Sequence, residues 1–416
     1  MPGSVPVIVA QHVEGLALLW STRRTLATSG HLSLTQLARF DHRIAAHEDG
    51  CVIAGDAGMT TLVGELQDAN AARLFAVGVV AIQTKRRDIF DRCLKIAEAL
   101  PAARAGLTSA LGWVDAPQLA GVASDLLKAS LAFRRSIGLA ACRVHRIDPG
   151  QVLFATLTDS DSRAQAEALR TAGVLGNPEH ASSCLDALSS ENSRVRFWAA
   201  WSSVLLGDRR LGLNALVRLA EGPSSHGSEA FGLALQALST SAGHETLTSL
   251  AGASELLRSL IRGTGIVGEP SYVPWLISHM SDEKTARLAG EALSLLAGAD
   301  LALLDLERKP PENFESGPND DPDDPNVDMD ADDGLPWPDA AKIEQWWAAN
   351  GSRFQKGTRY FMGQPVTKEH CIHVLKTGYQ RQRILAAHYL CLLDPGTPLF
   401  NTSAPAWRQQ RLLATM

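Results

Sequence analysis

The chain has 416 residues, of which 45% are hydrophobic, 6% aromatic and 20% charged. This composition is that of an ordinary globular protein and excludes disordered, collagen-like and disulfide-framework chains. Because single hydrophobic cores stop growing at roughly 250–300 residues, the length predicts several domains or one repeat array. The formal net charge is −6, and it is unevenly spread along the chain.

The six cysteines are widely spaced and form no Cys-x-x-Cys pair, which predicts buried thiols in a reducing compartment. The apolar run Val5–Ala10 is interrupted by Pro6 and is too short for a signal peptide. Stretches such as Phe75–Ile82 are far shorter than the roughly 18 apolar residues that span a membrane. We therefore expect a soluble, cytoplasmic protein with no membrane partner.

Residues 1–54 contain two apolar patterns of helical period, one around Leu16 and one around Leu37. The terminal units of a helical repeat array must cover an apolar face that would otherwise be exposed. We expect this segment to be an N-terminal helical cap.

A pattern with a period of about 30 residues extends over residues 55–304. Punctuation such as Leu206-Gly207-Asp208 predicts a helix that ends at glycine and a second helix that follows it. Two antiparallel helices per copy, stacked on their neighbours, predict an all-α fold, an α-solenoid of about eight or nine short helical-hairpin repeats. An arginine or glutamate opens the first helix of each copy, at Arg73, Arg104, Arg135, Arg163, Arg196, Glu229, Arg258 and Arg287.

The run Ser193–Ala200, followed by Leu206-Gly207-Asp208, resembles the short HEAT-like repeats first noted in phycobilisome lyases. The resemblance implies the same stacked helical hairpins. It implies no lyase activity, because a shared fold does not determine function.

Residues 305–341 form an acidic, proline-rich linker, in which eleven acids and no base occur between Glu312 and Asp339. Such a segment cannot pack a core of its own. We expect either a solvated tether or a segment that binds calcium or the basic C-terminal module.

The calcium alternative rests on the spacing of four aspartates. Asp328, Asp330 and Asp332 match positions 1, 3 and 5 of an EF-hand-like loop, and Asp339 matches position 12. The sharp turn of such a loop needs glycine at position 6, where this chain has Asp333.

Residues 342–416 contain ten Lys or Arg and three acids. A short hairpin is expected around Gly357, and the patterns around Val374 and Ala387 predict one more repeat-like helix pair. We therefore expect a basic, helical C-terminal module.

Several motifs in this second half resemble an uncharacterised proteobacterial family of HEAT-repeat proteins. Members of that family tend to be encoded beside type VI secretion spike and effector genes. The resemblance implies a type VI secretion effector, spike or toxin as the partner, and it brings no catalytic residues. The motifs are Leu335–Asp339, Trp346-Trp347, Phe354-x-x-Gly357-x-Arg359, Gly363-x-Pro365, Gly378–Arg383 and Leu399–Thr402.

Two patterns could hold a metal. His47-Glu48 and His244-Glu245 match the His-Glu pairs of the HEAT-repeat enzyme deoxyhypusine hydroxylase, but its two irons need four such pairs. A metal-dependent HEAT-repeat enzyme is therefore a lower alternative. The second pattern has the residue types of a zinc site, although core packing is the commoner role; it comprises Cys371, His373, His388 and Cys391.

No nucleophile elbow, phosphate-binding loop, dinucleotide fingerprint or zinc-protease motif occurs in the sequence. We expect no enzymatic activity, no catalytic residues, no cofactor and no metal. The basic charge and aromatic residues of the C-terminal module fit single-stranded nucleic acid, but the neighbouring acidic run would repel phosphates. Nucleic acid is therefore not the expected partner.

These observations predict a non-enzymatic adaptor that binds a protein, acting as an effector-loading adaptor or chaperone in type VI secretion. An immunity protein that neutralises a neighbouring toxin is the alternative. Trp and Arg dominate interface hot spots, so partner contacts are expected at Arg196, Trp198, Trp201, Trp275, Trp337, Trp346, Trp347, Arg381 and Arg383.

Overall fold

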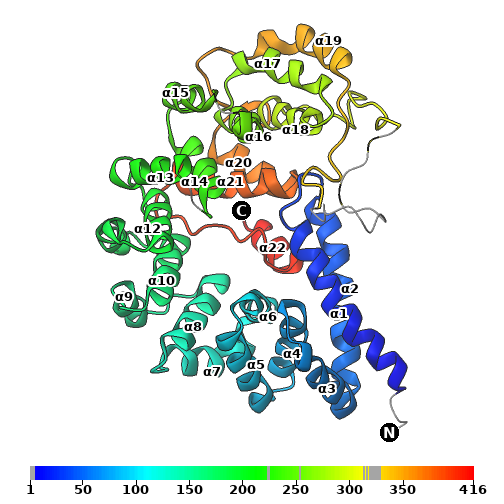
Figure 1. The fold of residues 1–416 in the computed structure, drawn as a ribbon, viewed down its shortest axis with the longest axis vertical. Helices are drawn as coiled ribbons and strands as arrows, with labels where there is room; N and C mark the ends of the chain where they lie inside the picture. The colour runs from blue at the N-terminus through cyan, green and yellow to red at the C-terminus, as the bar shows by residue number, and fades with distance from the viewer. Residues whose placement is uncertain (1–4, 223–224, 253, 313, 315–316, 318–328) are drawn as a thin grey trace. The chain divides into compact units, whose positions relative to one another are not determined.

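A computed structural model describes residues 5–222, 225–252, 254–312, 314, 317 and 329–416 (Figure 1). The chain divides into two compact units. Unit 1 contains residues 1–215 and 376–416, and unit 2 contains residues 216–375. No helix among the described residues is long and apolar enough to cross a membrane.

Unit 1 is built from helices and begins with two long ones, in the region where a helical cap is expected. Its helices are α1 (Pro6–Leu26), α2 (Leu34–Ile53), α3 (Gly55–Gly64), α4 (Ala71–Gln83), α5 (Arg87–Ala99), α6 (Arg104–Trp113), α7 (Ala116–Leu127), α8 (Ala132–His145), α9 (Gln151–Leu157), α10 (Ser162–Leu175), α11 (Ala181–Asp186), α12 (Ser193–Leu205), α21 (Gln380–Leu393) and α22 (Ala406–Leu413).

Two helices, α13 (Leu211–Glu221) and α20 (Lys368–Thr377), contain the points where the chain passes between the units. Unit 2 otherwise contains α14 (Gly227–Ala237), α15 (Thr240–Leu250), α16 (Leu257–Val267), α17 (Val273–Ser278), α18 (Ala286–Ala297), α19 (Ala340–Asn350) and the short strands β1 (Tyr360–Phe361) and β2 (Gln364–Pro365).

The first helices of successive repeats pack side by side. In unit 1 the order is α4, α6, α8, α10 and α12, and in unit 2 it is α14, α16 and α18. Small residues allow this close approach: a Cβ on Gly106 would overlap the Ala71 carbonyl, and one on Gly173 would lie 2.6 Å from Ser202 Cβ. The stacked helix pairs confirm the predicted all-α solenoid. The domain boundaries expected from the sequence remain predictions.

Helix α10 shows how the sequence sets each first helix. Asp161 caps its N-terminus, where one carboxylate oxygen accepts hydrogen bonds from the backbone N–H groups of Arg163 and Ala164. Gly176 ends it with a φ of 75°, a left-handed conformation that glycine adopts without steric cost. The predicted Gly punctuation is confirmed here and at Gly268 and Gly298.

The arginines that open the repeats have a shared local role. Four of them donate hydrogen bonds to backbone carbonyls five to seven residues earlier, at the end of the preceding helix or turn. Cations are favourable at helix C-termini, where carbonyls lack intrahelical partners. The pairs are Arg73 with Asp68, Arg104 with Ala97 and Glu98, Arg135 with Ala129 and Ser130, and Arg196 with Ser190 and Glu191.

In unit 2, the glycines that end α16 and α18 also make room for a later part of the chain. A Cβ on Gly268 would overlap the Tyr360 carbonyl oxygen, and one on Gly298 would lie 2.5 Å from the Met362 carbonyl oxygen. Arg359 extends this contact, because its guanidinium donates to Val267 O at 3.2 Å and to further carbonyls at the end of α14.

The hairpin lies a few residues later than expected. Strands β1 and β2 are antiparallel and pair Tyr360 with Pro365, so the turn is at Met362 and Gly363 and not at Gly357. The backbone N–H groups of these two turn residues donate to Leu295 O at 2.6 Å and to Leu296 O at 3.0 Å. The end of α18 therefore fixes the turn, which local sequence could not indicate.

Unit 1 repeats this arrangement. A Cβ on Gly176 would lie 2.7 Å from the Gly396 carbonyl oxygen, and one on Gly207 would lie 3.1 Å from Pro395 Cβ. The backbone N–H of Leu399 donates to the Val174 carbonyl at 2.9 Å, near the end of α10. In each unit, residues from the last part of the chain therefore cap the first helices of the repeats.

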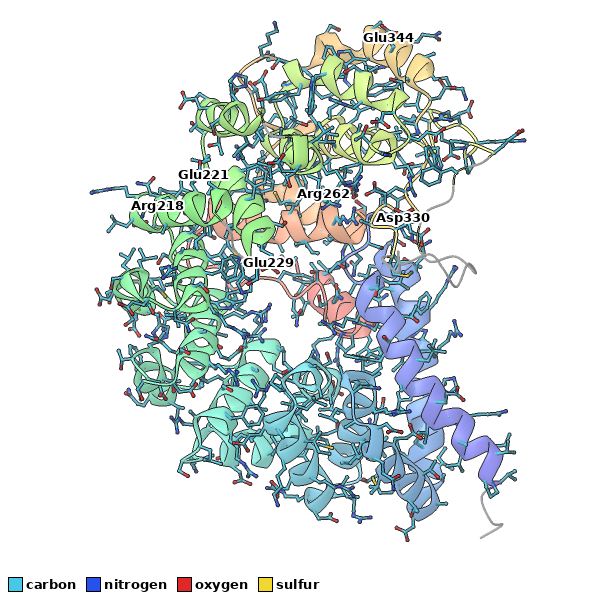
Figure 2. All side chains as sticks on the ribbon, in the orientation of Figure 1. Arg218, Glu221, Glu229, Arg262, Asp330 and Glu344 are labelled. Atoms are coloured by element: carbon cyan, nitrogen blue, oxygen red, sulfur yellow. The ribbon has the colours of Figure 1, made fainter. Side chains whose placement is uncertain are left out.

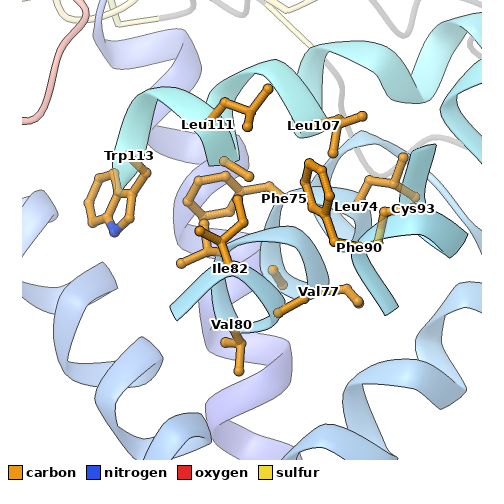
Figure 3. Packing of buried hydrophobic residues seen from close by; sticks show 14 of the residues in the cluster. Leu74, Phe75, Val77, Val80, Ile82, Phe90, Cys93, Leu107, Leu111 and Trp113 are labelled. Carbon is orange, nitrogen blue, oxygen red and sulfur yellow. The ribbon is translucent and has the colours of Figure 1, made fainter. Parts of the chain in front are cut away.

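The largest core cluster lies in unit 1 and is centred on α4 and α6 (Figure 3). Phe75 stacks on Trp20 of α1 with ring centroids 5.3 Å apart and meets the edge of Trp113 at 5.8 Å. One carboxyl group, that of Glu48, is buried beside these rings and is 3% exposed. Its Oε2 accepts a hydrogen bond from Trp113 Nε1 at 2.6 Å, and its Oε1 accepts one from Gln83.

Ala substitution of Gly268 should destabilise the protein by more than about 3 kcal/mol, because Cβ adds overlap with Tyr360 to the strain of a positive φ. Gly357→Ala is the matched control: its φ is 81°, but nothing lies within 4 Å of its Cβ position, so it should cost only about 1 kcal/mol. Urea denaturation of both variants measures the difference. Equal losses would show that the close approach at Gly268 carries no weight.

Burial raises the pKa of Glu48 from 4.5 to about 7, and the nearby Asp49 adds to the rise, although the Trp113 hydrogen bond opposes it. Between these pH values the folded protein holds a proton that the unfolded chain releases. Stability should therefore fall by roughly 3 kcal/mol as the pH rises from 4.5 through 7. In Glu48→Gln this part of the pH dependence should disappear, whereas Asp49→Asn should retain most of it. Urea midpoints at pH 5 and pH 8 test this, and parallel profiles for wild type and Glu48→Gln would contradict it.

Candidate functional site

Unit 1 contains a groove of about 1370 Å³. Its lining comes from α1, α6, α8, α10, the first residues of α12, and residues 401–405 of the returning chain. This volume exceeds the roughly 300–1,000 Å³ of ordinary small-molecule pockets. The groove is therefore large enough for a segment of polypeptide.

The groove is basic, since seven arginines and three acids line it. Two arginines are neutralised within the protein: Arg143 pairs with Glu167 at 2.7 Å, and Arg23 pairs with Asp41. The other five arginines are Arg24, Arg104, Arg163, Arg170 and Arg194. The positive charge of the groove comes mainly from these five.

Arg104 shows that these cations lie close together. Its pKa is lowered first by burial and then by the charges of Arg163 and Arg194, while Glu98 and Asp161 raise it more weakly. Three arginines from the first turns of α6, α10 and α12 therefore act on one another. Such crowding favours binding of an anionic group.

Aromatic side chains form an apolar base beneath the arginines. The guanidinium of Arg170 lies 4.3 Å from the Trp198 ring centroid, within cation–π distance. Arg24 lies 5.9 Å from the centroid of Trp20, whose ring packs on Phe75. These contacts hold flexible cationic side chains against rigid rings.

One side of the groove is a non-helical segment of the chain itself. Arg23 donates to the Ser403 carbonyl at 3.1 Å and to the Ala404 carbonyl at 3.0 Å. The partner of Arg23, Asp41, accepts a hydrogen bond from the backbone N–H of Ala406 at 2.6 Å. This buried Arg–Asp pair thus binds main-chain groups about 380 residues away in sequence.

Further side chains bind the same segment. Arg146 donates to the Leu399 carbonyl, and Asn401 donates to the Val144 carbonyl at 3.2 Å. Arg408 of α22 donates to three carbonyls at the end of α6, those of Gly112, Trp113 and Val114. Unit 1 therefore already holds a non-helical segment of polypeptide largely through its backbone.

Five of the residues predicted to contact a partner lie in unit 1. Trp198 and Trp201 of α12 are 8% and 7% exposed, and their rings pack edge to face at 5.3 Å. Arg196 binds the carbonyls of Ser190 and Glu191, which precede its own helix, and Arg381 donates to the Thr28 carbonyl at 3.0 Å. Of this set, Trp198 comes nearest to the groove, through Arg170.

Arg383 is completely buried and bonds the side-chain oxygens of Gln380 and Gln409, which joins α21 to α22. Burial lowers the pKa of Arg383 to about 10. A partner could reach this guanidinium only by displacing α22. Contact of these five residues with a partner remains a prediction.

The other four predicted residues lie in unit 2. Trp337 is 7% exposed and lies between the guanidinium groups of Arg287 and Arg308, at 4.9 and 5.3 Å from its ring centroid. The remaining three, Trp275, Trp346 and Trp347, are half-buried against the core of the unit. Their contact with a partner likewise remains a prediction.

Two aspartates in the described part of the acidic segment are bound to arginines. Asp332 pairs with Arg258 at 2.6 Å, and Asp330 pairs with Arg287 at 2.7 Å. Arg262 lies 3.9 Å from Asp332, and Figure 2 labels Arg262 and Asp330 near the place where α16 meets this segment. Opposite charge therefore attaches this stretch to the repeats of unit 2. Most of the acidic run, including Asp328 of the calcium pattern, lies outside the described residues.

No group of three or more metal-binding side chains occurs among the residues that the structure describes. Burial raises the pKa of Cys371 and of Cys391 to about 12 and lowers the pKa of His388 to about 4. Of the two His-Glu pairs, His47 contacts His12, and His244 lies 2.5 Å from the Tyr272 hydroxyl.

The repeat pattern indicates Arg104 and Arg163 as repeat-opening residues but does not indicate that they line the groove. Arg194 was present in the repeat motif as an unremarked neighbour of Arg196. Only the stacking of the first helices brings these three side chains to one groove, because Arg104 and Arg163 belong to repeats on either side of α8 and Arg194 lies beside the repeat-opening Arg196. No local motif shows which of these arginines pair within the protein.

Comparison with known proteins identifies the repeats. The family model described as HEAT repeats matches residues 150–239, from α9 to α14. No curated protein matches this chain. Among solved structures, the crystal structure of an engineered protein is 14% identical, with a TM-score of 0.32, and the match covers 71% of this chain and 90% of that chain. Residues 150–239 are therefore similar to HEAT repeats, and the stacked helix pairs on either side of them have the same helical-repeat architecture.

Asp41→Asn should release the segment that forms one side of the groove. The buried Arg23 would keep its charge without a carboxylate, which costs about 3–5 kcal/mol. Hydrogen exchange of residues 399–413 should therefore become faster. The control is Asp115→Asn, because that exposed carboxylate lies 3.8 Å from Arg408 and contributes little. Unchanged exchange in Asp41→Asn would contradict the anchoring role.

Proposed function

We propose that this protein is a non-enzymatic scaffold that binds a partner protein in the groove of unit 1. The observation that carries the proposal is the basic groove itself, one side of which is a non-helical segment of the chain held through its backbone. HEAT repeats commonly mediate protein interactions, which supports a binding function in general. No catalytic family is indicated by the comparisons.

We further propose a cytoplasmic adaptor or chaperone that loads an effector in type VI secretion. The support for this assignment is the resemblance of motifs such as Leu335–Asp339 and Gly378–Arg383 to a family encoded beside such genes. An immunity protein would use the same groove to hold a toxin. The identity of the bound partner separates the two roles.

Photo-crosslinking in living cells tests the scaffold. A photoreactive amino acid replaces Leu131, which is 50% exposed and lines the groove. The matched control replaces Ile53, which is 84% exposed and does not line it. We expect one predominant protein adduct from position 131 and none from position 53. Equal adducts at both positions, or none at either, would overturn the proposal.

The crosslinked protein identifies the role. A secreted spike or effector would support the loading adaptor. A toxin whose lethality this protein suppresses when the two are produced together would support the immunity protein and exclude the adaptor.

A further inference from the structure

Three arginines that line the groove lie at the N-terminal ends of their helices, and Arg104 among them also donates to carbonyls at the end of α5. Arg104, Arg163 and Arg194 occupy the first or second residue of α6, α10 and α12. The N-terminus of a helix carries partial positive charge, so a cation there is unfavourable and an anion is stabilising. Helix dipoles and side chains thus add to the same positive potential.

Equivalent arginines elsewhere in unit 1 are neutralised. Arg73 of α4 pairs with Glu65 at 2.8 Å, and Arg135 of α8 pairs with Asp159 at 2.6 Å. The side chains of Arg163 and Arg194, in contrast, are exposed and make no ion pair or hydrogen bond within the described part of the chain. The positive charges of Arg163 and Arg194 both act on Arg104 and lower its pKa. An anionic partner would remove this unbalanced charge.

We infer that the groove binds an acidic, non-helical segment of another protein, whose Asp and Glu side chains pair with Arg104, Arg163 and Arg194. This inference rests on the proposed scaffold function and names the chemistry of the partner. Arginine suits this task because its planar guanidinium binds carboxylates through two parallel hydrogen bonds.

The groove favours a polypeptide over a nucleic acid. Glu98, Asp161 and Glu167 lie among the arginines, and these carboxylates would repel a continuous phosphate backbone. A peptide can place neutral residues opposite the acids and carboxylates opposite the arginines. Apolar lining residues, including Leu131 and Phe133, suit the side chains of such a peptide.

We expect the bound segment to be non-helical and to be held partly through its backbone, because the neighbouring segment of the chain is held that way. Arg23 and Arg146 bind this segment through carbonyl oxygens and not through its side chains. A partner segment beside residues 399–405 would likewise offer backbone carbonyls to arginines. Its carboxylates then supply the specificity that carbonyls lack.

The test measures binding to the full-length protein by fluorescence anisotropy. The probe is a labelled peptide of about twelve residues in which Glu and Asp alternate with Ser and Ala. The control probes are the same peptide with Gln and Asn in place of the acids, and an oligothymidine of about the same length. Binding of the acidic peptide alone, weakening between about 50 mM and about 500 mM salt, supports the inference. Equal binding of the neutral peptide, or tighter binding of the oligothymidine, overturns it.

Charge reversal localises the site. The double variant Arg163→Glu/Arg194→Glu should bind the acidic peptide roughly a hundredfold more weakly, equivalent to about 2.7 kcal/mol. Arg39→Glu/Arg210→Glu is the matched control, with the same change in net charge at two exposed arginines that do not line the groove. Equal losses in both variants would place the effect in overall charge and overturn the site.

Thermal unfolding separates binding from structure. Since acids at helix N-termini are favourable, Arg163→Glu/Arg194→Glu should be at least as stable as wild type. Should this variant lose stability, Arg163→Gln/Arg194→Gln, which should bind about tenfold more weakly than wild type, decides the question. If position 131 gives crosslinks but the acidic peptide does not bind, the proposed scaffold function would stand and the acidic partner would be excluded. If neither the crosslinks nor the binding of the acidic peptide were observed, both the scaffold function and the acidic partner would be excluded.

Discussion

The backbone carbonyls at the C-terminal ends of the first helices are the groups on which this structure depends. Each such end leaves carbonyls without intrahelical partners, and in each unit a later part of the chain supplies many of the donors. Arg359 donates hydrogen bonds to carbonyls at the ends of α14 and α16 in unit 2, and Arg408 donates to carbonyls at the end of α6 in unit 1. The glycines at these ends are therefore under two demands, a left-handed φ and space for a crossing backbone. Gly268 meets both.

The N-terminal ends of the same first helices carry a partial charge of the opposite sign to that of their C-terminal ends. Their N-termini carry positive partial charge, and in the groove this charge is reinforced by arginines such as Arg163 and Arg194. A solenoid whose C-terminal helix ends are satisfied internally can leave its N-terminal ends for another molecule. Buried, paired arginines such as Arg23 build the wall of the groove, while exposed arginines supply its charge.

The repeat fold could be predicted from the sequence because its determinants are local. Gly176 and Gly298 end helices where the punctuation indicated, and small residues such as Gly173 lie at helix crossings. The groove could not be predicted in the same way. The pairing of Arg23 with Asp41, and of both with the chain near Ala404, joins segments that no local pattern connects. The tryptophans predicted to contact a partner could not be tested by sequence alone. The size and polarity of a tryptophan ring do not distinguish one at an interface from one packed in the core, such as Trp198.

Because distant residues cap the helix ends, parts of unit 1 can form their final contacts only after the last part of the chain has been synthesised. Most solenoid contacts join neighbouring repeats, but Arg146 and the Leu399 carbonyl that it binds are 253 residues apart. At a synthesis rate of about 5–20 residues per second, roughly 10–50 seconds separate the two on the ribosome. During this interval water must solvate the helix ends of unit 1, and the groove lacks the wall that residues 401–405 provide. The binding surface is therefore finished well after the repeats that carry its arginines have been made.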